Sequence, residues 1–443
     1  MGKQGIFGII LGLLLIGILA LPMALRAIPP RYVARFLPQT LQDLAAPKQE
    51  SSILPTVVQP IDASALLAEL EEPAQVEPIS DLPPATFTPI PTIGGETISQ
   101  AVATPTLSPT IQPTPTNTPI PIPAAARLEG FQHHFQTWNN CGPATMAMTL
   151  SYFGLRITQN DTAAVLKPNP EDRNVSPYEM VDYVNEQTEF VALSRVNGRL
   201  DTLKRLVANN IPVIIELGID PPGEYRWLGW YGHYLLVVAY DDANEQFWVF
   251  DSWFGTSLVP GENANANGRD LPYSELETFW PHFNNNYIPV YKSEQAVQVA
   301  NIVGTDMDDA AMWQNSLVTA QRNAAADPEN PFFWFNLGTT YNALADYEKA
   351  ATAFDQARSL GLPWRMLWYQ FGPYEAYYQV GRYEDMILLA DVTLKDRPYF
   401  EESFYYKGLA LAAQGESAAA QNNFEDAADF NPNFAPAIAA LNR

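Results

Sequence analysis

The chain has 443 residues, with 49 acidic against 25 basic side chains and a formal net charge of −24 at pH 7. Such acidity, without a basic stripe, excludes nucleic acid as a partner and disfavours tight binding to anionic lipid. The single cysteine excludes an internal disulfide and a thiolate zinc cluster, and we expect neither a metal nor a cofactor.

Residues 1–35 are predicted to be a membrane anchor. Gly5 to Leu25 carries no charge and is rich in Ile and Leu. At ~1.5 Å per residue, a helix of this length crosses a ~30 Å bilayer core. No clear cleavage site follows, so we expect an uncleaved anchor, with a cleaved signal peptide as the alternative. Arg26 and Arg31 favour a body that stays inside, but the next segment leads us to expect an extracytoplasmic body.

Residues 36–126 are rich in proline and are predicted to be a disordered linker. The Thr/Pro run from Thr104 to Pro123 is typical of an extended, polyproline-like chain. Its hydroxyl density suits a glycosylated stalk that holds a domain off a membrane. A bare disordered linker is the alternative, and it gives the same spacer function. One short helix is expected within 62–71.

The only cysteine, Cys141, lies in the segment Asn-Cys-Gly-Pro-Ala. Pro143 suits the first turn of a helix, and apolar residues then keep helical spacing until Gly154. Cys141 is therefore predicted at a helix N-terminus, where the macrodipole and free N–H groups favour a thiolate. An inert core cysteine is the alternative, and it would more often lie inside an element.

A thiolate nucleophile needs an imidazole, and His233 opens an apolar run over 234–240 that predicts a buried strand. A turn follows, and Asp251 closes the returning strand 246–250. Folding this hairpin places His233 opposite roughly positions 251–253. We therefore expect His233 and Asp251 to be cross-strand neighbours.

Cysteine, histidine and carboxylate follow one another in the order that papain uses for its nucleophile, base and orienting group. His133 and His134 lie too close before the cysteine to be the obvious base, although they can line a cleft. His282, within Trp-Pro-His-Phe, is interpreted as structural. Aromatic residues gather in sequence just ahead of the nucleophile and the base, where they form either a substrate cleft or core: Trp138, Trp230 and Tyr231.

The stretch from Gln136 to about Tyr291 resembles the papain-like peptidases that process bacteriocin precursors after a double-glycine leader. It looks most like the stand-alone relatives that lack the transporter. The resemblance rests on five separated segments in order: Asn-Cys141-Gly-Pro-Ala, Leu150-Ser-Tyr-Phe-Gly, Ile211-Pro-Val-Ile-Ile, Gly-His233-Tyr-Leu-Leu-Val-Val-Ala-Tyr-Asp, and Asp251-Ser-Trp. No phosphate-binding Gly-x-x-x-x-Gly-Lys motif accompanies them.

The resemblance implies a catalytic role for each matching residue. Cys141 would be the nucleophile, His233 the general base and then acid, and Asp251 the group that orients His233. Gln136 would donate to the oxyanion together with the Cys141 backbone N–H. Gln132 lies nearby and is the alternative donor.

Beyond about residue 300 an internal period predicts an all-α solenoid. Trp334, Gly338, Tyr341 and Phe354 match the tetratricopeptide signature, and the pattern recurs loosely from Tyr374 and again from Phe404. A helix near 306–326 and another over 435–441 would close the stack. The inward helix would show Phe335, Asn336 and Asn342, and lysines that clamp a carboxylate are not evident there.

The predicted fold is multidomain, with an α+β papain-like peptidase domain over 127–297 and a tetratricopeptide-repeat domain over 298–443. The predicted function is that of a membrane-tethered cysteine peptidase that cleaves a peptide or protein substrate, with repeats that bind this substrate or a protein partner. Acyl transfer or cell-wall amide cleavage by the same residues is one alternative. A non-catalytic peptide-binding module is the other.

Overall fold

The computed structural model describes residues 53–56, 63–68, 122–137, 139–169, 174–220, 229–253 and 268–442, together with Leu21 and Ala24. The membrane helix predicted over 5–25, apart from those two residues, lies outside this part of the chain, as does most of the linker predicted over 36–126. Of the helices described, none combines the length and hydrophobicity needed to cross a bilayer.

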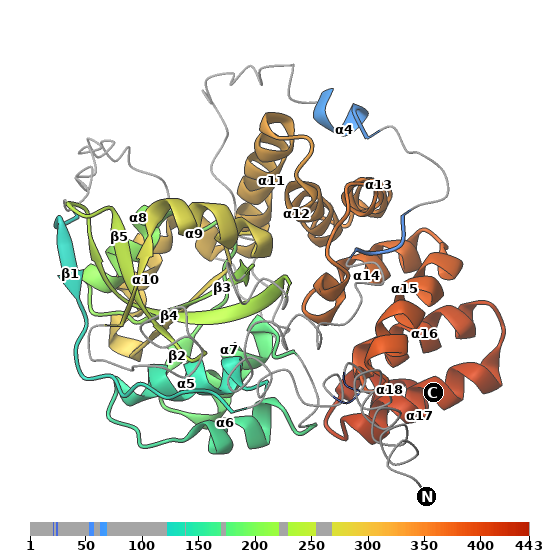
Figure 1. Ribbon diagram of the computed structural model, residues 1–443, viewed down its shortest axis with the longest axis horizontal. Coiled ribbons are helices and arrows are strands. Elements are labelled where there is room, and N and C mark those ends of the chain that lie inside the picture. The colour runs from blue at the N-terminus through green and yellow to red at the C-terminus, as the bar shows by residue number, and fades with distance from the viewer. Residues whose placement is uncertain are drawn as a thin grey trace, which may run out of the picture. The chain divides into compact units, whose positions relative to one another are not determined.

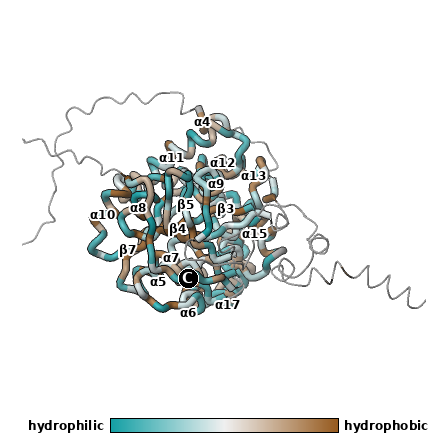
Figure 2. The backbone as a smooth tube through the Cα atoms, turned by 60° about the vertical axis from the view of Figure 1, so that its left-hand side comes forward, coloured by the Kyte–Doolittle hydropathy of each residue, from teal (hydrophilic) through white to brown (hydrophobic). Residues whose placement is uncertain are grey.

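An antiparallel sheet forms the centre of the first half of the structure, with the strand order β2-β7-β3-β4-β5-β6 and β1 paired to β4. The strands are β1 (Ala125–Arg127), β2 (Val191–Ala192), β3 (Val213–Ile219), β4 (Tyr231–Asp241), β5 (Gln246–Asp251), β6 (Arg269–Pro272) and β7 (Tyr287–Tyr291). Almost every residue of β3 and β4 is buried, because the sheet packs against a hydrophobic core on each of its faces. In Figure 2 hydrophobic and hydrophilic segments of the backbone alternate along the labelled helices and strands.

Helices cover the sheet from both sides (Figure 1). On one face lie α5 (Cys141–Ser151), α6 (Gln159–Leu166) and α7 (Pro177–Gln187); on the other lie α8 (Leu200–Ala208), α9 (Tyr273–Phe279) and α10 (Ala296–Val303). Alternate residues of β3 divide between the two cores, with Ile214 facing α5 and Ile215 facing α8. The mixed α and β character expected for this region is thus present.

The β4–β5 hairpin carries one irregularity that determines which side chains share a face. Ala239 pairs with Trp248, but Val237 pairs with Val249, so Val238 is an extra residue in β4. The carbonyl of Val238 instead accepts a hydrogen bond of 2.8 Å from the N–H of Leu128, just after β1. Beyond this bulge, Asp251 lies opposite Leu235.

The second half of the structure is a succession of helices, each packed on the next (Figure 1). They are α11 (Asp309–Ala326), α12 (Pro331–Ala343), α13 (Tyr347–Ser359), α14 (Gly372–Gln379), α15 (Tyr383–Asp396), α16 (Glu401–Ala413), α17 (Ser417–Phe430) and α18 (Ala435–Leu441), with a 3₁₀ helix η5 (Trp364–Trp368) before α14. The helices expected near 306–326 and over 435–441 correspond to α11 and α18.

Glycines allow two of these helix pairs to approach closely. A Cβ atom on Gly338 of α12 would lie 2.7 Å from the ring of Phe354 in α13. The same arrangement recurs between α16 and α17, where a Cβ atom on Gly408 would lie 2.5 Å from the ring of Phe424. These contacts fit the small-residue positions of the predicted repeats. The assignment of the helices to the tetratricopeptide class stays a prediction.

The two halves share a hydrophobic core. Trp230 and Phe283, from the sheet-containing half, belong to the same buried cluster as α12, α13 and α14. The Arg365 guanidinium in η5 donates to the carbonyl oxygen of Trp230 over 3.1 Å and lies 4.0 Å from the ring centroid of Tyr231. The helical half therefore packs directly against the start of β4.

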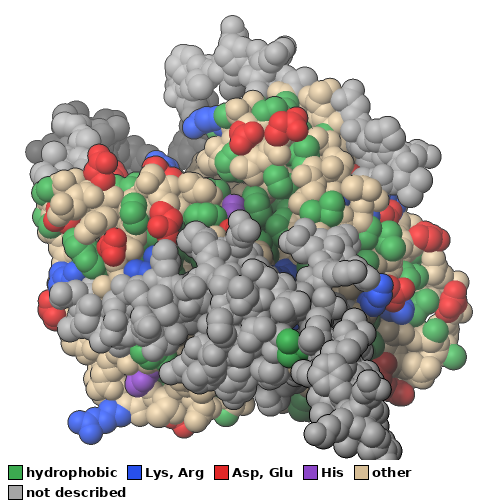
Figure 3. All heavy atoms as spheres, in the orientation of Figure 1, with side chains coloured by type: hydrophobic (Ala, Val, Ile, Leu, Met, Phe, Trp, Pro, Cys, Tyr) green, Lys and Arg blue, Asp and Glu red, His purple; other side chains and the backbone are tan. Residues whose placement is uncertain are grey.

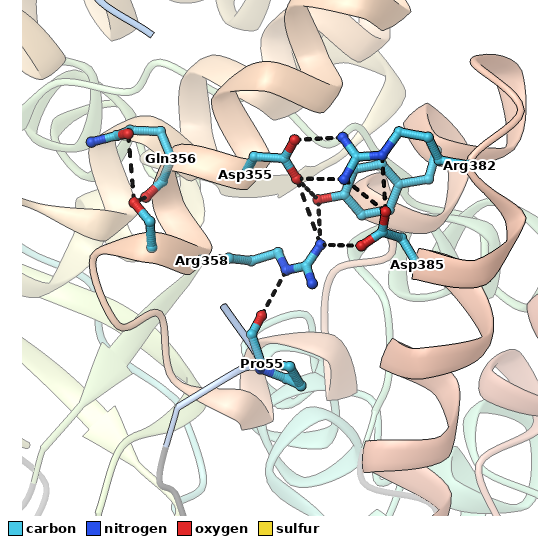
Figure 4. A network of polar contacts seen from close by, with 8 residues as sticks. Pro55, Asp355, Gln356, Arg358, Arg382 and Asp385 are labelled. Carbon is cyan, nitrogen blue, oxygen red and sulfur yellow. Dashed lines mark hydrogen bonds and ion pairs between the residues drawn. The ribbon is translucent and has the colours of Figure 1, made fainter. Parts of the chain in front are cut away.

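A buried network of charges ties the helices together (Figure 4). Asp355 is fully buried and accepts hydrogen bonds from the Tyr377 hydroxyl and the Arg382 guanidinium. Arg358 reaches Asp385 over 3.0 Å and also donates over 2.9 Å to the carbonyl oxygen of Pro55. Each buried charge thus has an opposite charge beside it, as burial requires.

Part of the predicted linker is docked on this helical region. Leu54 is fully buried, and its N–H donates over 2.8 Å to the carbonyl oxygen of Leu362. The short helix α4 (Ala65–Ala68) buries Leu66 in the same core. The prediction of one disordered linker over 36–126 therefore does not hold for residues 53–56 and 63–68, because their apolar side chains find partners far along the chain.

The charge imbalance of the sequence is visible on the surface. On the face drawn in Figure 3, acidic side chains of the described residues lie over both the sheet-containing half and the helical half.

The close contact at Gly338 yields a stability prediction. In Gly338→Ala the new methyl group must displace the ring of Phe354, and we expect the free energy of unfolding to fall by about 1–2 kcal/mol despite the better helix propensity of alanine. Denaturant unfolding of the full chain measures this change. Phe354→Leu should make space, so the double variant should lose less than the sum of the two single losses. Strict additivity would contradict this account.

Candidate active site

Cys141 is the first residue of α5, as the sequence predicts, and its side chain is half-buried. No side chain caps this helix end, so its first N–H groups keep their positive potential for a nearby anion. The helix is fixed on the sheet because the Thr145 hydroxyl donates to the Tyr234 carbonyl oxygen over 3.3 Å. The Lys167 ammonium, which donates over 2.8 Å to the Asn139 carbonyl oxygen, adds a positive charge near the thiol.

The imidazole of His233 lies between the thiol and a carboxylate. Its Nε2 is 2.9 Å from Oδ1 of Asp251. Its ring also hydrogen-bonds the side chain of Cys141. Because Nε2 faces Asp251, Nδ1 is the atom left for the sulfur. His233 is 2% exposed and Asp251 is 0% exposed, so the contact between them is shielded from water.

Asp251 is surrounded by donors. The backbone N–H of Trp253 donates to Oδ1 over 2.8 Å, and the Arg269 guanidinium donates to Oδ2 over 3.2 Å. Both of these groups are donors, and hydrogen bonds between a guanidinium and a carboxylate are among the stronger ones in proteins. Asp251 is thus oriented as an acceptor toward His233.

The electrostatics favour a charged sulfur and a charged ring. Burial raises the pKa of the Cys141 thiol, but the hydrogen bond and charge of His233, the Tyr234 N–H and the charge of Lys167 together hold that pKa below its usual value. Burial alone would lower the pKa of His233, whereas Asp251 and Cys141 together raise it to about 9. Both shifts stabilise the thiolate–imidazolium pair relative to the neutral thiol and imidazole.

Gln136 is held by Ser252, the residue after Asp251. The Ser252 hydroxyl donates to Oε1 of Gln136 over 2.8 Å, and the Gln136 N–H donates over 2.8 Å to the Ser252 carbonyl oxygen. Since the amide oxygen is occupied, the NH₂ group of Gln136 is the part left to donate. Gln132 is exposed, and its backbone N–H donates to the Ser151 hydroxyl over 2.8 Å.

The aromatic residues proposed for a substrate cleft lie in different surroundings. Trp230 is 9% exposed, stacks on Phe283 and donates its ring N–H to His282 over 3.0 Å. Tyr231 is half-buried and lies against Trp253 and Arg365. Trp138 lies outside the described residues.

Burial disfavours the charged form of two of the three remaining histidines, His282 and His133. Burial lowers the pKa of His282 to about 3, and its ring stacks on Phe332 at 3.5 Å. Burial also lowers the pKa of His133, whose Nε2 lies 2.8 Å from the Asp251 carbonyl oxygen. His133 therefore supports the strand end that carries Asp251, which the sequence did not indicate.

A buried glutamic acid near the thiol was also not indicated by the sequence. Glu216 in β3 is 3% exposed, and burial together with the nearby thiolate raises its pKa well above the usual range. It hydrogen-bonds Tyr234, whose hydroxyl donates to the Val175 carbonyl oxygen over 2.7 Å. Burial thus favours the neutral form of Glu216, which places no negative charge beside the sulfur.

The helical half reaches the same site. Tyr369, which follows η5, accepts a hydrogen bond from the Gly232 N–H, next to His233. A Cβ atom on Gly232 would lie 2.6 Å from the Phe283 ring and 3.2 Å from the Tyr369 ring. No sequence pattern around residue 369 indicates that Tyr369 contacts Gly232. Within the described chain no group of three or more His, Cys, Asp or Glu side chains gathers to bind a metal ion.

Comparison with known proteins relates part of this chain to peptidases. The model of the Peptidase_C39 like family matches residues 127–284. A solved Bacillus anthracis protein assigned as a C39-like peptidase aligns at 15% sequence identity over 38% of this chain and 98% of its own, with a TM-score of 0.29. No curated protein matches the chain. Residues 127–284 thus match a family of peptidases.

The thiolate–imidazolium pair can be tested by alkylation, because Cys141 is the only thiol. As pH rises, labelling by iodoacetamide should begin well below the ordinary thiol pKa of about 8.5, because His233 lowers the pKa of Cys141. Labelling by the anionic reagent iodoacetate should weaken again above about pH 9, where His233 loses its charge.

In His233→Ala the two largest contributions that lower the thiol pKa, the hydrogen bond and the charge of His233, are lost while burial of the thiol remains. Labelling should then require a pH at or above the ordinary thiol pKa. Labelling of the unmodified chain that starts only near pH 8.5 would show that Cys141 is an ordinary thiol.

Proposed function

We propose that this protein is a cysteine peptidase that cleaves peptide bonds through Cys141, His233 and Asp251. One observation carries the proposal: His233 contacts the thiol at the start of α5 on one side and the buried carboxylate of Asp251 on the other. The match to a peptidase family over residues 127–284 supports the same reaction class. The specific processing of double-glycine leaders is not part of the proposal.

In the proposed reaction, the Cys141 thiolate attacks the carbonyl carbon of the scissile peptide bond. The imidazolium of His233 then gives its proton to the leaving amine, and the C–N bond breaks to leave a thioester on Cys141. Neutral His233 next takes a proton from water, whose oxygen attacks the thioester carbon. The C–S bond then breaks, which releases the acid and restores the Cys141 thiolate beside the imidazolium. Asp251 keeps the ring oriented and stabilises its positive charge throughout.

The oxyanion formed during each attack needs donors that are already in position. The NH₂ group of Gln136 and the backbone N–H of Cys141 are proposed for this role. The hydrogen bond from Ser252 supports the choice of Gln136. Because the amide oxygen of Gln136 accepts this bond, the NH₂ group is the end of the amide left to donate to the oxyanion. Among the described residues the side chain of Gln132 forms no such hydrogen bond.

The remaining parts of the chain are assigned by the same proposal. Residues 5–25 would anchor the protein in a membrane, with the body on the extracytoplasmic side. Residues 127–297 would form the papain-like peptidase domain, and residues 298–443 would form tetratricopeptide repeats that bind the substrate or a protein partner. The shared core around Trp230 supports a close coupling of the two domains.

Hydrolysis of a peptide library by the full chain tests the proposal. We expect Cys141→Ala and His233→Ala each to lower kcat by about a thousandfold or more. The unfolding midpoint should stay nearly unchanged in Cys141→Ala and fall in His233→Ala, which removes a buried ring, so activity is measured at a temperature at which both variants are folded. Asp242→Asn, which removes a carboxylate at the far end of the same hairpin, serves as the control and should retain full activity. Cleavage that survives both active-site changes would refute the proposal, and ligation to an added amine without hydrolysis would indicate acyl transfer instead.

The oxyanion donor can be identified by comparing two glutamines. We expect Gln136→Ala to lower kcat by about 10²–10³-fold, as the loss of one oxyanion donor does in other enzymes. Gln132→Ala should leave kcat within about twofold of the unmodified chain, because surface substitutions have small effects. The reverse ranking would move the donor to Gln132.

A further inference from the structure

A pocket of about 460 Å³ lies in the helical half, away from Cys141. Helices α11, α12 and α14 supply most of its wall. Its lining includes three aromatic rings and three polar side chains: Trp313, Tyr347, Phe371, Thr339, Asn342 and Glu375. A volume of this size lies within the range of ligand sites in proteins.

Glu375 brings an unbalanced negative charge to this pocket. Its carboxylate accepts from the Asn342 amide over 2.6 Å and from the Tyr406 hydroxyl over 3.1 Å. Both of these donors are neutral. Among the described residues no Lys or Arg forms an ion pair with Glu375, whereas Asp355 in the neighbouring helix has two guanidinium groups beside it. The charge of Glu375 is therefore available to a ligand.

The contact with Glu375 also fixes the direction of the Asn342 amide. A carboxylate accepts hydrogen bonds only, so Asn342 must turn its NH₂ group toward Glu375. Its Oδ1 is then the free end of the amide, and this atom is buried without a partner. Oγ1 of Thr339, one turn earlier in α12, is also buried without a partner. Two side chains that line the pocket thus carry buried oxygens without a partner, one an amide acceptor and the other a hydroxyl that can accept or donate.

The ligand that satisfies these groups must combine several N–H donors with a positive charge. A guanidinium has five N–H donors in a planar fork, is always charged, and stacks on aromatic rings such as those of Trp313, Tyr347 and Phe371. We propose that this pocket binds the side chain of an arginine in a peptide. Only the idea that such a peptide is the substrate rests on the proposed peptidase function.

The proposal is tested by binding, without turnover, in the full chain carrying Cys141→Ala. The probes are two fluorescein-labelled Gly/Ser peptides that differ at one position, arginine in one and citrulline in the other. Citrulline keeps the shape of arginine but has no charge. Fluorescence anisotropy should give about tenfold tighter binding of the arginine peptide, the scale expected for hydrogen bonds to a charged group.

Matched variants locate the effect. Glu375→Gln keeps the size of the side chain and should abolish the preference for arginine. Glu329→Gln removes the same charge from an exposed position just before α12, at the end opposite Asn342, and should keep the preference. Equal affinity for the two peptides, or a preference that survives Glu375→Gln, would overturn the proposal. Because Cys141 is absent from the assay, neither result depends on whether the chain is a peptidase.

Discussion

The geometry of the candidate active site depends on one extra residue in a β-strand. If β4 kept the pairing of Ala239 with Trp248 to its other end, Asp251 would lie opposite Leu236 and would point to the face away from His233. The bulge at Val238 shifts the pairing by one, which puts Asp251 opposite Leu235 and on the face of His233. Their contact is diagonal across the two strands, a separation that long side chains can span.

The charged groups of the site form a chain in which each group stabilises the charge of its neighbour. Arg269 balances Asp251, Asp251 stabilises the charged form of His233, and His233 stabilises the thiolate. Burial raises the pKa of Glu216, the other buried acid near the sulfur, and so favours its neutral form. A second carboxylate charge there would raise the pKa of the thiol, because like charges disfavour one another at short range.

Local signals in the sequence predicted much of this arrangement, including the start of α5 at Cys141, the β4–β5 hairpin and the ends of α11 and α18. They could not predict the bulge, because it depends on a hydrogen bond from Leu128, far from Val238 in the chain. Arg269, Ser252 and Tyr369 also reach the site only through tertiary packing. The predicted linker was described by its composition alone, which cannot show that Leu54 is buried against Leu362.

The docking of residues 53–56 and 63–68 changes the meaning of the Pro/Thr-rich stretch. That stretch leaves the body after Leu66 and returns to it at β1, so both of its ends are anchored on the same folded unit. Its length then enters the free energy of folding as a loop-closure entropy, which grows only slowly with the number of residues. The distance between the body and any anchor at residues 5–25 is limited instead by residues 26–52, at ~3.5 Å per residue when extended. Inserting or deleting Thr-Pro units would leave that distance unchanged.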